Sequence, residues 1–157
     1  MRRNDRKVDD TVEIAKILDQ CDACRLAMID ENRPYIVPMN FGYSQGDGSV
    51  TLYFHSANQG RKIDILKAKS DVCVEMDCGH ELIVGSTDCS HSMAYESLIG
   101  NGIAEFIEEI EEKRLALTQI MKKYTSRDHF EFDEKMLSRL SVFKIIVIDF
   151  TGKRRSK

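Results

Sequence analysis

The sequence predicts a mainly β protein, an antiparallel barrel with helices at its periphery. Five or six short apolar stretches rich in strand-forming residues are separated by turn residues. The helical patterns between them are few, do not alternate with the strands, and include no G-x-G-x-x-G motif. These observations exclude a doubly wound α/β sheet and favour an antiparallel barrel.

The N-terminal half indicates a helix followed by a strand meander. Asp10 and Glu13 have the spacing of a capping box at the start of a helix within residues 9–21. Pro38 interrupts an apolar run, which favours an edge strand or a bulge at that point. A short helix is expected over 60–69. The predicted strands are 24–30, 35–44 and 50–56, with turns at 30–34 and 45–49.

The C-terminal half contains the most regular helix of the sequence, at 108–124. Its apolar face is predicted to consist of Ile110, Leu117, Ile120, Met121 and Tyr124. Residues 79–93, rich in Gly, Ser, His and Cys, match no regular element. The remaining predicted elements are strands at 71–78, 95–107 and 141–152 and a helix at 133–140.

Composition restricts the protein's class and its partners. We expect one domain over residues 1–157 with a basic tail from about residue 152, because the length suits a single core and no linker or repeat is visible. A net charge of −3 gives no reason to expect a nucleic-acid partner, and the short basic ends at 1–7 and 153–157 are interpreted as solvated termini. No apolar run is long enough for a membrane span or a signal peptide.

The cysteines also indicate a cytoplasmic protein, because five thiols without a secretory signal are typical of that compartment. Cys21 and Cys24 have C-x-x-C spacing. They follow a helix, at the negative end of its dipole, whereas a reactive thiolate is favoured at a helix N-terminus. We therefore interpret them as small apolar residues at a junction.

The stretch LYFHSANQGRKIDIL, residues 52–66, has the residue types of an anion site. A helix that begins near Gly60 offers free backbone N–H groups and the positive end of its dipole. Arg61 adds a planar fork, Lys62 a point charge, and Ser56 a hydroxyl. The pattern is compatible with a phosphate site or with an ordinary solvated helix start.

The same stretch resembles the strand, loop and helix of FMN-binding split barrels of the pyridoxamine 5′-phosphate oxidase-like family, in particular their nitroimidazole-resistance-related branch. The resemblance covers roughly residues 1–148. It rests on MRRNDRKV, CRLAMID, PYIVPMNFGY, LYFHSANQGRKIDIL and SLIGNGIAEF in this order. It implies a homodimer of split β-barrels, with FMN bound at the subunit interface.

The resemblance also implies roles for individual residues. Arg61 and Lys62 would hold the FMN phosphate, with Ser56 assisting, and His55 would lie close to the ring. Tyr95 and Ser97 would come from the partner subunit. The full set that it places at the cofactor is Pro38, Met39, Asn40, Phe41, Phe54, His55, Ser56, Gly60, Arg61, Lys62, Tyr95 and Ser97. Relatives often carry a basic or bulky aromatic residue just before residue 95, which this chain lacks.

The resemblance further implies an FMN-dependent oxidoreductase that reduces a small planar acceptor such as a nitroimidazole. His55 would either donate a proton to the substrate or only hydrogen-bond the flavin or the strand end. Oxidation of pyridoxamine phosphate is disfavoured, because the sequence shows no second compact basic cluster. No metal is expected.

Three alternatives remain open at this point. The protein could bind flavin without turnover, as a store or a redox sensor. The same barrel could bind haem or deazaflavin. The two Cys-x-His pairs, Cys78 with His80 and Cys89 with His91, could hold zinc, although their one-residue gaps are shorter than usual for that metal.

Overall fold

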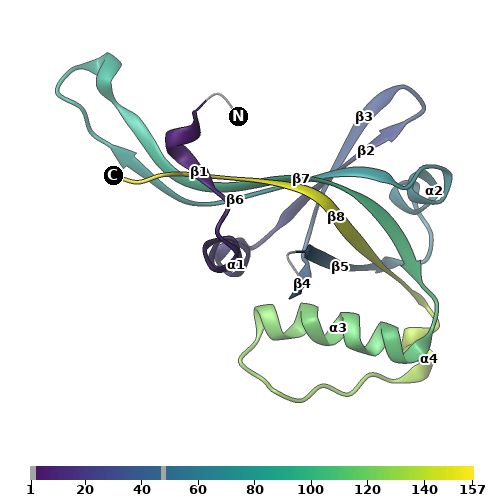
Figure 1. The fold of residues 1–157 in the computed structure, drawn as a ribbon. Helices are drawn as coiled ribbons and strands as arrows, with labels where there is room; N and C mark the ends of the chain where they lie inside the picture. Colours follow the sequence, from purple (N-terminus) through teal and green to yellow (C-terminus); the bar gives the residue numbers. More distant parts are fainter. Residues whose placement is uncertain (1–2, 47–48) are drawn as a thin grey trace.

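The computed structural model describes residues 3–46 and 49–157, which form a strongly curved antiparallel sheet with helices around it (Figure 1). The sheet has eight strands within these residues, in the order β3-β2-β6-β7-β8-β5-β4, and β1 adds to β8. The predicted mainly β fold with peripheral helices is confirmed. The strands are β1 Lys7–Val8, β2 Cys24–Asp30, β3 Arg33–Met39, β4 Gly42–Gly46, β5 Ser49–Ala57, β6 Asp71–Ile83, β7 Ser92–Ile107 and β8 Leu140–Arg155.

Aspartate side chains cap two of the helices, α1 through Asp10 and α4 through Asp133. Asp10 accepts hydrogen bonds from the backbone N–H groups of Val12 and Glu13, both at 3.0 Å, and so caps the first long helix as predicted. None of the helices in the described ranges has the length and apolarity needed to cross a membrane. The helical elements are η1 Asn4–Arg6, α1 Thr11–Gln20, α2 Arg61–Ala68, η2 Asp88–Ser90, α3 Ile110–Tyr124 and α4 Glu134–Leu137.

The main core lies between the inner faces of the strands and α1 and α2. Phe54 of β5 stacks on Phe143 of β8, with ring centroids 5.3 Å apart, and both side chains are fully buried. A smaller cluster fills the space under α3, where Leu117 and Ile120 pack against Val142. The predicted apolar face of α3 is therefore correct at its centre, whereas Ile110 is largely exposed.

The predicted strand at 35–44 is two strands in the structure. β3 pairs with β2, and β4 pairs with β5, so the chain changes partner at Asn40 and Phe41. Gly42, the first residue of β4, lies directly against α3. A Cβ at this position would lie 2.4 Å from backbone atoms of Gln119 and Ile120, so β4 approaches α3 as closely as only glycine permits. The predicted turn at 45–49 includes residues outside the described ranges.

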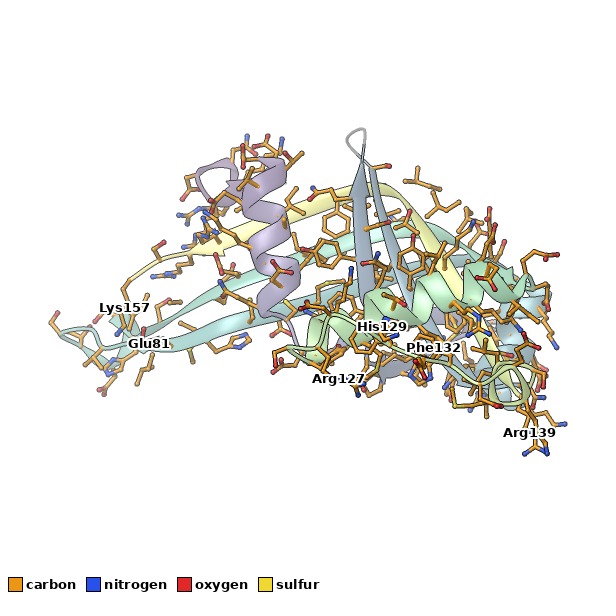
Figure 2. All side chains as sticks on the ribbon, turned by 90° about the horizontal axis from the view of Figure 1, so that it is seen from below. Glu81, Arg127, His129, Phe132, Arg139 and Lys157 are labelled. Carbon is orange, nitrogen blue, oxygen red and sulfur yellow. The ribbon has the colours of Figure 1, made fainter. Side chains whose placement is uncertain are left out.

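The unassigned stretch 79–93 belongs to a long hairpin of β6 and β7 that projects from the barrel (Figure 1). β8 pairs with β7 as far as Arg155, so much of the predicted basic tail is strand rather than solvated terminus. Lys157 forms an ion pair with Glu81 of the hairpin, and Figure 2 shows these two residues side by side. The basic C-terminal end is ordered because its backbone pairs with β7 and because Arg154 and Lys157 form ion pairs with Glu96 and Glu81.

Candidate functional site

The candidate site lies where β5 ends and α2 begins, at the edge of the barrel (Figure 1). Gly60 is the residue before the helix and has a φ of 128°, a backbone conformation that glycine adopts readily. Its carbonyl accepts hydrogen bonds from the backbone N–H groups of Ile63 and Asp64, at 2.8 and 3.1 Å. The N–H groups of Arg61 and Lys62 precede these and have no carbonyl partner within the helix, which makes this end suitable for an anion.

Arg61 extends from this first turn to the hairpin of β2 and β3. Its Nε and Nη2 atoms both lie 2.7 Å from Oδ2 of Asp30, and its guanidinium carbon lies 4.3 Å from the centre of the Tyr35 ring. The side chain remains largely exposed. A planar cation that is fixed by stacking and reached by solvent is well suited to bind a phosphate, and Asp30 occupies it in this structure.

His55 and Lys62 face each other across the same corner. Partial burial lowers the pKa of His55, and the positive charge of Lys62 lowers it further. Both effects favour the neutral imidazole. Ser56 points to the opposite, inner side of β5, where its hydroxyl donates to the carbonyl of Ala57 at 3.0 Å. The structure therefore places Lys62 near His55, directs the Arg61 side chain to the β2–β3 hairpin, and turns the Ser56 hydroxyl to the inner side of β5.

The predicted residues 38–41 lie at the far end of β3, the strand that starts beside Arg61. Pro38 and Asn40 are exposed, and the Asn40 side chain donates to the carbonyl of Asp22 at 3.4 Å. β3 is an edge strand within the described sheet, so one row of its backbone N–H and C=O groups is available to a ligand. Roughly 10 Å of edge separates Tyr35 from Pro38 at the usual rise of a strand.

Besides Ser56, three of the predicted cofactor residues have side chains inside the protein. Phe41 and Phe54 are fully buried, and Met39 is nearly so. Their side chains contribute to the core and cannot contact a surface ligand in this arrangement. Only the backbone of these residues could take part in a site at β3 or at the end of β5.

Tyr95 and Ser97 do not lie at the corner of their own chain. Both β5 and β7 pair with β8, which gives a common reference: His55 lies opposite Val142 of β8, whereas Tyr95 lies opposite Arg155. At the usual rise of a strand, the two positions are about 40 Å apart when measured along β8. If these residues contribute to the same site, they must do so from a second subunit, as the resemblance implies.

A shallow apolar groove with a volume of about 380 Å³ lies on the outer face of the sheet, next to the β2–β3 hairpin. It contains none of the predicted site residues. Its lining includes Ile29, Pro34, Cys73, Asn101 and Ile148. The sequence does carry a sign of this groove: the strands that line it have apolar residues on both faces. A sheet with one face in water normally has polar residues on that face.

The Cys and His residues considered for zinc are not gathered into a site. His80 Nε2 lies 2.7 Å from a carboxylate oxygen of Asp77, and His91 Nδ1 lies 3.0 Å from the carbonyl of Thr87. The described residues contain no cluster of three or more side chains suited to a metal ion. Cys21 and Cys24 are buried free thiols, and burial raises the pKa of Cys24 to about 12, which opposes redox reactivity.

Comparison with known proteins settles the family. The family model described as pyridoxamine 5′-phosphate oxidase matches residues 10–154. The chain belongs to this family. The matched range includes the corner at 55–62, the β3 edge and nearly all of β8. None of the curated proteins matches the sequence significantly.

Solved structures of the same fold include one with substantial sequence similarity. This is a candidate 5-nitroimidazole antibiotic resistance protein from Bacteroides thetaiotaomicron, with 41% identity and a TM-score of 0.82 over 94% of this chain and 86% of that one. An FAD and haem binding protein from Mycobacterium smegmatis has 16% identity and a TM-score of 0.85 over 97% of this chain and 74% of that one.

The flavocytochrome Anf3 from Azotobacter vinelandii has 18% identity and a TM-score of 0.77 over 100% of this chain and 72% of that one. At this level of identity, the Mycobacterium and Azotobacter proteins support the split-barrel fold alone. The family match and the Bacteroides protein confirm the resemblance found in the sequence.

Proposed function

We propose that this member of the pyridoxamine 5′-phosphate oxidase family binds FMN and reduces a small planar acceptor such as a nitroimidazole. The observation that carries the proposal is the Arg61 guanidinium, which is exposed at the start of α2 and stacked on Tyr35. The Arg61 side chain lies beside Tyr35, near the start of β3, and the free edge of β3 continues from there to Pro38. The family match supports a flavin as the ligand.

Arg61, Lys62 and the first-turn amides of α2 would hold the phosphate. Arg61 would exchange the Asp30 carboxylate for two phosphate oxygens, a geometry that its planar fork favours. The free backbone edge of β3 near Pro38 and Asn40 would orient the ring. Bound flavin would supply two-electron chemistry between a hydride donor and the acceptor. The neutral form of His55, favoured here, would accept or share a proton rather than carry a fixed charge.

A homodimer would complete the site. The outer face of the sheet exposes apolar side chains that a monomer would leave in water, among them Ile148, 70% exposed, and Ile36, 58% exposed. A second copy against this face would bury them, and it could bring Tyr95 and Ser97 to the corner of its partner. A cytoplasmic location stays a prediction from the sequence.

Titration with FMN tests the proposal. Purified wild-type protein should quench FMN fluorescence, and Arg61→Gln should weaken the affinity by about tenfold or more, because a charge-assisted bidentate contact is lost. Lys16→Gln is the control, since it removes an exposed cation on α1 whose partner Glu13 contacts Arg154, at the opposite end of β8 from the residues that pair with the corner. A wild-type protein that ignores FMN, or an Arg61→Gln variant that binds it equally well, contradicts the proposal.

Turnover is a separate measurement. Under anaerobic conditions, NADH or NADPH should bleach the flavin absorbance, and a nitroimidazole should restore it. Bleaching without recovery on any acceptor would favour a flavin-binding protein without turnover. A Soret band in the purified protein would instead indicate haem.

A further inference from the structure

Two cysteines that are far apart in the sequence lie together at the end of α1. Cys21 is the residue that ends α1, and its side chain is fully buried in the main core. Cys78 of β6 is partly buried and packs against the same core. It continues the inward-facing row of Val74 and Met76, so its thiol lies on the side of the sheet that α1 contacts (Figure 1).

The contacts of Cys78 place its thiol beside that of Cys21. Its Sγ donates a hydrogen bond to the side-chain oxygen of Gln20 at 3.8 Å, and Gln20 is the residue directly before Cys21. The two thiols also share a hydrogen bond with each other. The natural partner of Cys21 is therefore a cysteine 57 positions away, rather than Cys24 of the C-x-x-C sequence.

Burial and charge decide which of the two thiols reacts first. Burial raises the pKa of both, and it does so strongly for Cys21. Asp77 raises both further, and Glu96 raises that of Cys78. Lys123 donates hydrogen bonds to two carbonyls in the last turn of α1, at 2.5 and 3.1 Å, and its charge favours both thiolates. Cys78 is the more exposed thiol, so a small molecule in solution reaches it first.

The backbone after Cys78 departs from regular pairing. The register between β6 and β7 shifts between Cys78 and Glu81, and Gly79 has a φ of 65°. Such a bulge interrupts the ladder and bends the strand. A disulfide needs its sulfurs to approach to about 2.05 Å, closer than hydrogen-bonded thiols. The bulge lets this part of β6 move toward α1 without breaking a continuous ladder.

We propose that Cys21 and Cys78 form a dithiol site that hydrogen peroxide oxidises to an intramolecular disulfide, which fastens α1 to the β6–β7 hairpin. The Cys78 thiolate attacks the O–O bond and becomes a sulfenic acid, and the other oxygen leaves as water with the thiol proton. Cys21 then attacks the Cys78 sulfur, and hydroxide leaves as water with the Cys21 proton. Two thiols and one peroxide thus give one disulfide and two waters.

Peptide mapping of the oxidised wild-type chain tests the proposal directly. Reduced, flavin-free protein is treated with hydrogen peroxide, alkylated and digested. Cleavage after Asp and Glu places each of the five cysteines in a different peptide, so mass spectrometry identifies the pair without ambiguity. The expected product joins Cys21 to Cys78 and disappears on reduction. No disulfide, a disulfide between other cysteines, or oxidation of Cys78 to a sulfinic acid alone rejects the proposal.

Thiol titration of matched variants gives a second test. Cys89→Ser removes the exposed thiol at the tip of the hairpin, which could otherwise react by itself. In this parent protein, peroxide should lower the number of free thiols by two, and dithiothreitol should restore both. Adding Cys78→Ser should abolish this paired loss. A paired loss that survives in Cys78→Ser shows that other cysteines react, and it contradicts the assignment.

Urea unfolding tests whether the bond fastens the two elements. A disulfide between residues 21 and 78 restricts the unfolded chain, so oxidation of wild type should raise the urea midpoint, and dithiothreitol should reverse the shift. Cys78→Ser should have the same midpoint with and without peroxide. An unchanged or lower midpoint in oxidised wild type rejects the fastening. These measurements use protein without flavin, so their failure and that of the FMN titration are independent.

Discussion

The backbone N–H of Phe41 donates a hydrogen bond to the Tyr124 hydroxyl at 3.1 Å, and this hydroxyl donates to the carbonyl of Asp22 at 2.8 Å. The last residue of α3 therefore joins the link between β3 and β4 to the junction between α1 and β2. Asn40 reaches the same Asp22 carbonyl at 3.4 Å. The segment that would orient the flavin ring is thus held in place by a helix on the outside of the barrel.

Tyr124→Phe tests whether this connection matters for the ligand. Loss of the hydroxyl leaves the Phe41 N–H without its partner, which should lower the free energy of unfolding by about 1 kcal/mol and weaken FMN binding severalfold. Urea unfolding and FMN titration measure the two effects. Tyr43→Phe is the control, because its hydroxyl bonds Asp19 at 2.7 Å. It should lower stability only, and equal FMN affinity in wild type and Tyr124→Phe would argue against the role.

Asp30 competes with a phosphate for Arg61, so its neutralisation should improve FMN binding. Asp30→Asn removes the charge that now accepts from Arg61 at 2.7 Å. An exposed ion pair is worth up to about 1 kcal/mol, so the dissociation constant should fall by at most about fivefold. Glu31→Gln removes a neighbouring acidic charge without an ion pair to Arg61 and should have less effect. Weaker binding by Asp30→Asn would show that the carboxylate positions Arg61 instead.

Gly42→Ala should destabilise the fold strongly. The new methyl group would meet the backbone of Gln119 and Ile120 at 2.4 Å, and neither backbone can move without displacing α3. Overpacking of this kind costs about 1–3 kcal/mol or more. Gly46→Ala places a methyl group where no atom lies within 4 Å. It should change the denaturant midpoint little, and similar midpoints for the two variants would refute the close packing of β4 on α3.

The protonation of His55 should respond to Lys62. The pKa of His55 is lowered in the folded protein, so protonation favours the unfolded state. The stability that the neutral ring contributes is therefore lost as the pH falls below about 6.5, the unfolded pKa. In an NMR titration, Lys62→Gln should raise the pKa of His55, and bound FMN should raise it as well. Lys16→Gln, which removes an exposed lysine on α1, is the control and should leave the pKa of His55 unchanged.

Sequence periodicity predicted the elements that have one face in the core. The strand at 24–30 was correct to the residue, because alternate residues such as Leu26 and Met28 face the interior while their neighbours face outward. The strands at 71–78 and 95–107 were also predicted, whereas the outer part of the β6–β7 hairpin, residues 79–93, was not assigned, because it projects from the barrel and has little core to face. Without burial on one side, the sequence there carries no clear alternation.

The candidate site was predictable only in its local parts. Gly60, Arg61 and Lys62 are consecutive, so the start of a helix could be recognised from the sequence. The contacts of Arg61 with Asp30 and Tyr35 depend on the pairing of β2 with β3 and on the position of α2 against them. Basic residues from both ends of the sequence, such as Lys7 and Lys153, also lie side by side, and only the pairing of β1 with β8 brings them together.

The long strand β8 also has a consequence for how the chain folds. It follows in sequence all three strands that it pairs with, and its ladders to β5 and β1 close loops of most of the chain. Contacts between residues so distant in sequence form slowly, because the loop entropy is lost before the contacts are gained. Until β8 docks, the edges of β5 and β7 remain open to pairing with other molecules. Refolding yield should therefore fall steeply with protein concentration, and the docking of β8 is the step that protects the chain from aggregation.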